Sequence, residues 1–242
     1  SLFTLQGDPM EAAAWREQAL FKKDVPNTAM PVDIDGDGDL DILAAARIAQ
    51  DAYILENLGL AADGSVRTAP HRIAIDDSSV PGCTVRTSAF QSAFRDMNGD
   101  GRPDLVTGVF ENCGDPRAPG GLPALGWLEQ PDALDAPWTY HRIGDIVPDM
   151  VIAVELGDID GDGDLDAITG GYSGLNILKG GYTGATRDAD HPDVTASSTV
   201  GRIAWFENPG IAGGDWQRHD VSRRVRGMFD QFIAHDMDGD GD

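Results

Sequence analysis

The sequence has few of the features that would bring it to nucleic acid or into a membrane. Only 18 lysines and arginines stand against 41 aspartates and glutamates, so the formal net charge is −23. A chain this acidic is repelled by nucleic acid and by anionic membrane surfaces, and it attracts cations. No apolar run approaches the ~20 residues of a membrane-spanning helix, and Ser1 opens no charged and then apolar signal segment. Both a mature secreted protein and a cytosolic one fit these absences.

Cysteines and catalytic signatures are also scarce. Two cysteines are too few for a disulfide-built scaffold. The sequence contains no phosphate-binding Gly-Lys loop and no His-Glu-x-x-His zinc helix. Residues 171–174, Gly-Tyr-Ser-Gly, lack the Gly-x-Ser-x-Gly spelling of a nucleophile elbow. The sequence therefore names no catalytic group. What it does contain, 30 glycines and 14 prolines, favours short strands joined by turns.

The acidic residues are concentrated in four stretches that share one sequence motif, Asp-x-Asp/Asn-Gly-Asp-Gly. These stretches begin at residues 33, 96, 158 and 236. The positions that we expect to hold a metal ion are Asp33, Asp35, Asp37, Asp39 and Asp41; Asp96, Asn98, Asp100, Arg102 and Asp104; Asp158, Asp160, Asp162, Asp164 and Asp166; and Asp236, Asp238, Asp240 and Asp242.

The spacing within each stretch suits Ca²⁺. This hard cation takes six to eight oxygen ligands, and side chains at loop positions 1, 3 and 5 converge on one point if the backbone curls sharply. Glycine at position 6 permits the curl because it reaches positive φ without strain. Position 7 then offers a backbone carbonyl and position 9 a carboxylate. The alternative is a set of Asp-Gly hairpin turns that bind nothing.

The residues around the loops predict β-hairpins and exclude an EF-hand. An EF-hand needs Glu at position 12 and flanking helices, whereas position 12 here is Ala44, Thr107 and Thr169. The flanking segments favour strands. We expect them at residues 29–32, 90–94 and 151–156 before the loops, and at residues 41–45, 104–109 and 166–170 after them.

The repeat extends beyond the loops. A third predicted strand contains a similar short motif at residues 54–57, 127–130 and 205–208. A fourth predicted strand follows at residues 70–73, 138–143 and 216–221. Residues 15–20 resemble that fourth strand alone. Four strands at a period of about sixty residues are typical of a propeller blade. The expected fold is thus all-β, a β-propeller of four-stranded blades.

The Asp-rich hairpin and the two tagged strands resemble FG-GAP/VCBS-type repeats, which are related to the calcium-binding propeller repeats of integrin α-subunits. The resemblance implies a calcium-bearing propeller that serves as an adhesion module, a glycan binder, or a carbohydrate lyase or dehydratase. This sequence departs from the pattern at Asn98, Arg102, Thr68 and Gln18. We therefore expect the second metal site to be weaker than the others.

The expected blades cover residues 27–74, 88–143 and 150–221, with part of another at residues 229–242. Residues 14–23 would form the outer strand of the closing blade. Because three blades cannot close a ring, we expect a longer natural protein of six or seven blades.

The two cysteines are expected to pair. Cys83 precedes the second hairpin and Cys113 follows it, and a hairpin returns both ends to the same side. A disulfide fits a secreted or cell-surface protein, and two free thiols would fit a reducing compartment.

Two functions remain open, and the sequence does not decide whether the protein is an enzyme. The first is a calcium-stabilised extracellular module that binds a glycan or a protein. The second is a carbohydrate-active enzyme of the lyase or dehydratase kind. In either case we expect the ligand on the face opposite the metal loops, where irregular inserts at residues 111–123 and 172–200 gather. The candidate ligand-face residues are Tyr172, Tyr182, Arg187, Asp188, Asp190 and His191.

Overall fold

The computed structural model describes residues 1–23, 26–46, 48–87, 89–115, 120–146, 149–172, 203–210, 214–222 and 231–233. These residues form an all-β structure, with a single 3-10 turn at Ala12–Ala14 (η1). No helix in the described ranges is long and apolar enough to cross a membrane.

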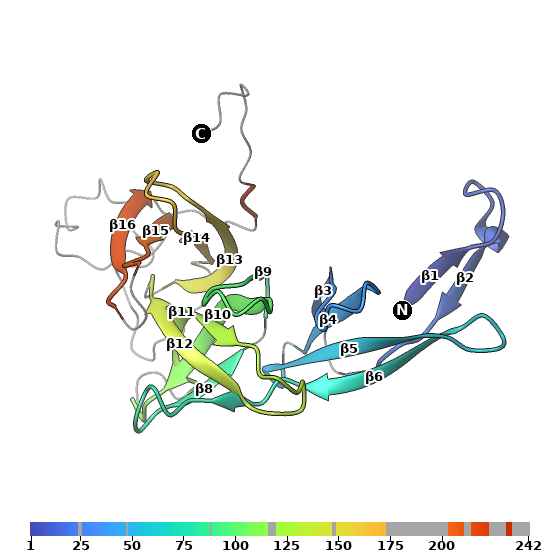
Figure 1. The fold of residues 1–242 in the computed structure, drawn as a ribbon, viewed down its shortest axis with the longest axis horizontal. Coiled ribbons are helices and arrows are strands. Elements are labelled where there is room, and N and C mark those ends of the chain that lie inside the picture. Colours follow the sequence, from blue (N-terminus) through green and yellow to red (C-terminus); the bar gives the residue numbers. More distant parts are fainter. Residues whose placement is uncertain are drawn as a thin grey trace.

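Two four-stranded antiparallel sheets share the same strand order along the chain (Figure 1). The first, blade 1, contains β3 (Pro26–Val32), β4 (Asp41–Ala46), β5 (Asp51–Leu60) and β6 (Val66–Arg72). The other, blade 3, contains β13 (Met150–Gly157), β14 (Asp166–Tyr172), β15 (Ile203–Glu207) and β16 (Gln217–Ser222). Each strand pairs with the next one in sequence, as in the blades of a propeller.

Blade 2 lies between them and departs from the simple pattern. It contains β8 (Thr84–Thr87), β9 (Ala93–Arg95), β10 (Asp104–Asn112), β11 (Leu122–Glu129) and β12 (Trp138–Gly144). Both β8 and β9 pair with β10, so the first strand of this blade is split. A further short strand, β7 (Ile75–Asp76), pairs in parallel with β12.

The split explains why the strand expected at residues 90–94 is only partly formed. Ala89 is buried and has a φ of 38°, which interrupts the extended backbone. Its N–H donates to Thr87 Oγ1, and Ser92 Oγ lies 2.9 Å from Thr107 Oγ1. Buried hydroxyl groups thus take over hydrogen bonding where the ladder is broken.

The blades are joined face to face by two apolar cores. Leu43, Ile54 and Leu105 lie in the core between blades 1 and 2, whereas Val106 and Phe206 lie in the core between blades 2 and 3. Adjacent residues of one strand point to opposite faces of its sheet. Leu105 and Val106 therefore serve different cores, which is why blade 2 is apolar on both faces.

The N-terminal strands β1 (Leu2–Leu5) and β2 (Trp15–Gln18) form a two-stranded sheet of their own. This hairpin lies beside the end of the β5–β6 hairpin (Figure 1). Gln18 Nε2 donates to the carbonyl of Val66, and the N–H of Val66 donates to Gln18 Oε1. The proposal that residues 14–23 complete a closing blade stays a prediction. The all-β, propeller-type fold expected from the sequence is confirmed.

Candidate functional site: the Asp-rich loops

Three Asp-rich loops occupy the same place in their blades. Loop 1 (residues 33–41), loop 2 (residues 96–104) and loop 3 (residues 158–166) each join the first strand of a blade to the second. Glycines at positions 4 and 6 have φ between 75° and 96° in all three loops. Sequence reasoning had singled out only position 6. In this left-handed conformation both glycines turn their own backbone N–H groups toward the first aspartate.

The first aspartate of each loop organises the turn. The two carboxylate oxygens of Asp33 accept the N–H groups of Gly36 and Gly38 at 2.9 and 3.1 Å. Asp96 and Asp158 accept the corresponding groups in their own loops. The acidic side chains therefore stabilise the turn even before any ligand is considered.

The last aspartate fastens each loop to the sheet. In loop 1, Asp41 is buried and accepts the N–H of Ile34 at 3.0 Å and the N–H of Asn57 at 2.7 Å. Asp104 and Asp166 are buried and accept the equivalent pairs of backbone N–H groups. Two hydrogen bonds from backbone donors favour the charged form of a buried carboxylate.

Loops 1 and 3 bring three carboxylates within reach of one cation. Oxygens of Asp33, Asp35 and Asp37 lie within 4.8 Å of one another, as do oxygens of Asp158, Asp160 and Asp166. Oxygen donors at this spacing suit Ca²⁺, whose ligand distances are about 2.3–2.6 Å.

Asp35 in loop 1 and Asp160 in loop 3 have raised pKa values. Burial, together with the charges of Asp37, Asp41 and Glu56, raises the pKa of Asp35 despite a hydrogen bond from the N–H of Asp37. Burial and the charges of Asp162, Asp166 and Glu207 likewise raise the pKa of Asp160.

Asp164 adds an unsatisfied group to loop 3. Its Oδ1 atom is buried and has no hydrogen-bond partner among the described residues. Burial and the neighbouring Asp162 and Asp166 raise the pKa of Asp164. A buried carboxylate oxygen without a partner is rare in folded proteins and calls for a cation or a proton.

Loop 2 differs because it contains its own positive charge. Arg102 Nη2 lies 2.6 Å from Asp100 Oδ2, and Arg102 Nη1 lies 2.9 Å from Asp132 Oδ1. Position 3 is an amide, and Asn98 Nδ2 donates to Asp100 Oδ2 at 3.2 Å. The pKa of Asp96 is lowered because hydrogen bonds from the N–H groups of Gly101 and its neighbours outweigh the effect of burial. Asp104 is the exception, since burial raises its pKa to about 6.

The opposite end of blade 2 carries the disulfide. Strand β10 begins at Asp104 in loop 2 and ends at Asn112, next to Cys113. The predicted pair, Cys83 and Cys113, is joined, with the Cα atoms 4.1 Å apart. Tyr172 ends β14, which begins at Asp166, so Tyr172 also lies at the end of its blade away from loop 3.

Other predicted site residues lie outside the described residues. These are Asp236, Asp238, Asp240 and Asp242 of the fourth loop, and Tyr182, Arg187, Asp188, Asp190 and His191 of the insert. Near Tyr172's end of the blades, sequence reasoning missed an ordered network in blade 2. Tyr140 donates to Glu111 at 2.8 Å, and Arg142 pairs with both Glu111 and Asp145.

Sequence reasoning also missed a His–Glu contact that recurs in blades 1, 2 and 3. His71, His141 and His219 each place Nε2 2.8 Å from Glu56, Glu129 and Glu207 respectively. His141 stacks on Trp127 and His219 on Trp205, with ring centroids 3.9 and 4.2 Å apart. The signal was present, because both partners recur at fixed repeat positions on neighbouring strands.

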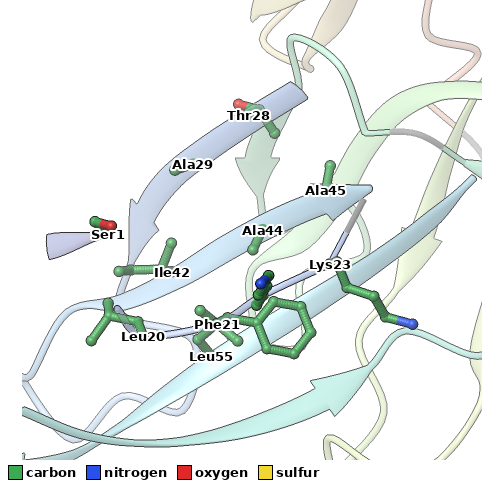
Figure 2. Close-up of a pocket in the computed structure, with 11 residues that line it drawn as sticks. Ser1, Leu20, Phe21, Lys23, Thr28, Ala29, Ile42, Ala44, Ala45 and Leu55 are labelled. Carbon is green, nitrogen blue, oxygen red and sulfur yellow. The ribbon is translucent and has the colours of Figure 1, made fainter. Parts of the chain in front are cut away.

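One apolar cavity of about 220 Å³ lies away from the loops, between the segment after β2 and blade 1. Figure 2 shows Leu20 and Phe21 against Ile42, Ala44 and Leu55. The ring of Phe21 lies 4.9 Å from that of Tyr53. None of the predicted site residues lines this cavity.

Comparison with known proteins agrees with the loop geometry. The family described as an FG-GAP-like repeat matches residues 33–107, from the start of loop 1 into β10. Residues 33–107 are an FG-GAP-type repeat. Neither the curated proteins nor the solved structures gave a match to the chain. The FG-GAP-type repeat and the all-β fold fit a propeller-type binding module.

Proposed function

We propose that the chain is part of a calcium-stabilised extracellular binding module, with the metal ions held in its Asp-rich loops. The observation that supports this proposal best is the convergence of three carboxylates in loop 1 and three in loop 3. Such clusters repel themselves when empty, because like charges a few ångströms apart interact strongly. A divalent cation reverses that repulsion.

The choice of Ca²⁺ rests on the ligands. The loops offer carboxylate and carbonyl oxygens from a curled backbone, which suits a cation that accepts flexible geometry at six to eight ligands. Mg²⁺ demands a tighter octahedron. Calcium affinities of extracellular modules, on the order of 10⁻⁴–10⁻³ M, are the expected range.

An extracellular location fits the disulfide. Bonds such as Cys83–Cys113 persist in oxidising compartments and are rare in the cytosol. Extracellular calcium would also keep loops of modest affinity filled. The ligand that we propose is a glycan or a protein, bound on the face away from the metal loops.

Calorimetric melting in calcium and in chelator tests the metal proposal. A cation at about one hundred times its Kd adds ~2.7 kcal/mol per site, and 1 kcal/mol moves the midpoint of a domain this size by ~2–4 °C. Equal midpoints under the two conditions would sink the proposal.

The matched control is the double variant Asp35→Asn, Asp160→Asn. An asparagine oxygen still accepts the N–H of the residue at position 5, as Asn98 does in loop 2 at 3.0 Å. The turn should therefore form, while each cluster loses one charge. The calcium-dependent part of the midpoint shift should shrink in this variant.

A further inference from the structure

His71 joins two blades through two carboxylates. Its Nε2 atom lies 2.8 Å from Glu56 Oε2, on the neighbouring strand of blade 1. Its Nδ1 atom lies 2.8 Å from Asp135 Oδ1, in the turn between β11 and β12 of blade 2. The side chain of His71 is 17% exposed, whereas that of Asp135 is 80% exposed.

The number of protons on the imidazole of His71 decides which of these two hydrogen bonds can form. An ionised carboxylate only accepts hydrogen bonds, and neutral imidazole has one N–H and one bare nitrogen. A neutral His71 can therefore satisfy only one of its two carboxylates, and its bare nitrogen then faces the lone pairs of the other. Only the imidazolium donates to both.

We propose that protonated His71 is a pH-dependent latch that holds blade 1 to blade 2 through Glu56 and Asp135. When His71 loses its proton, the contact with Asp135 opens first. Asp135 lies on an exposed turn and can move into water, whereas Glu56 is three-quarters buried on the adjacent strand.

The electrostatic surroundings favour the protonated form. Among the described residues, the charged groups that act most strongly on His71 are Asp135 from the β11–β12 turn and Glu56 from β5. Burial alone would lower the pKa of His71, but the hydrogen bonds and charges of Asp135 and Glu56 outweigh it and raise the pKa. Arg72, the next residue, pairs with Asp51 instead.

The sign of the pH effect follows from the raised pKa. The latch contributes its full stability below the pKa of histidine in the unfolded chain, about 6.5. The contribution is lost as the pH rises through the higher pKa of the folded state. The contact between blades 1 and 2 should therefore weaken at mildly alkaline pH.

The same chain provides references for His71. His141 and His219 each have a glutamate on Nε2 and a tryptophan against the ring, where His71 has Ile54 in the tryptophan position. Gln18 occupies the equivalent position on β2 and forms hydrogen bonds with the backbone of Val66, the first residue of β6. An amide at this position makes a contact of the same kind without titrating.

The test is an NMR titration of the histidines in the wild type and in Asp135→Asn. The variant removes one charge from an exposed turn, so the fold should persist. The pKa of His71 should lie above the ordinary value of a histidine, about 6.5, in the wild type. It should fall by about one unit in Asp135→Asn, in keeping with the loss of one neighbouring opposite charge, while the other two histidines stay unchanged.

Melting midpoints at about pH 5.5 and 8.5, in saturating calcium and fixed salt, provide the second readout. Between pH 5.5 and pH 8.5 the melting midpoint of the wild type should fall further than that of Asp135→Asn or His71→Gln. A His71 pKa that is unchanged in Asp135→Asn would overturn the proposal. An equal loss of midpoint in the wild type and His71→Gln would overturn it as well.

Discussion

Asp166 Oδ1 accepts the backbone N–H of Asn208 at 2.9 Å, so the last acidic residue of loop 3 is joined to the residue directly after β15. Its other oxygen accepts the N–H of Ile159, near the start of the same loop. One buried carboxylate therefore ties together the two ends of the loop and the end of β15. Asp166 therefore stabilises the sheet in addition to any role in binding a cation.

Replacing Asp166 by alanine should destabilise the protein even in chelator. The substitution leaves the buried N–H groups of Ile159 and Asn208 without an acceptor, and each unsatisfied group costs about 1–3 kcal/mol. Urea unfolding in excess chelator measures the loss. The control is Asp162→Ala in the same loop, whose carboxylate accepts the exposed N–H of Asp164. Equal unfolding free energies for the two variants would contradict this reading of Asp166.

Replacing Arg102 by aspartate should have opposite effects without and with calcium. The change gives loop 2 the residue that loops 1 and 3 have at position 7. In chelator the midpoint should fall, because Asp100 and Asp132 lose their guanidinium partner. Adding calcium should raise the melting midpoint of the variant more than that of the wild type, since an extra carboxylate strengthens cation binding.

Arg86→Asp makes the same change in net charge at an exposed position of β8, at the other end of blade 2. This control should leave the difference between calcium and chelator unchanged. If Arg102→Asp behaves like Arg86→Asp, then Arg102 does not set the cation affinity of loop 2, and the expectation of a weaker second site loses its physical basis.

The fold could be predicted because the local and repeated signals agree. Alternating apolar residues predict the strands, the Asp-Gly spelling predicts the tight loops, and the period of about sixty predicts the blades. The roles of loop residues such as Asp33 and Asp41 follow from their positions in the repeated motif. The first strand of blade 2 could not be predicted in detail, because its interruption at Ala89 depends on buried hydroxyl groups from two strands.

Contacts between blades were beyond the sequence. Nothing in the spelling of residues 130–138 indicates that Asp135 meets His71, since the two residues are far apart in the chain and join only when the blades pack. Within blade 2, the pairing of Arg102 with Asp132 is hidden as well, because the two residues are distant in the chain and meet only when the blade folds. Repeats predict what is common to all blades, whereas these contacts occur where one blade differs from the others.

The disulfide should account for a measurable part of the stability. Cys83 and Cys113 are 30 residues apart, and closing a loop of this length in the unfolded chain is worth about 3–4 kcal/mol in the chain-entropy model. The double variant Cys83→Ser, Cys113→Ser should therefore unfold at lower urea. Its calcium-dependent midpoint shift should persist, because loop 2 lies at the other end of β10. Mass spectrometry of the native protein should show no alkylatable thiol.

Deleting residues 183–197 should separate ligand binding from metal binding. This insert carries Arg187, Asp188, Asp190 and His191, and it follows Tyr172 at the end of blade 3 away from loop 3. Long loops on a rigid scaffold are where binding residues gather, and charged groups beside tyrosine suit a polar ligand such as a glycan. Binding on a glycan array, or lyase activity if the module is an enzyme, should vanish in the deletion variant. The calcium-dependent melting transition should survive, since the metal loops are untouched. Full binding in the deletion variant would place the ligand elsewhere, and loss of both properties would show that the insert supports the fold.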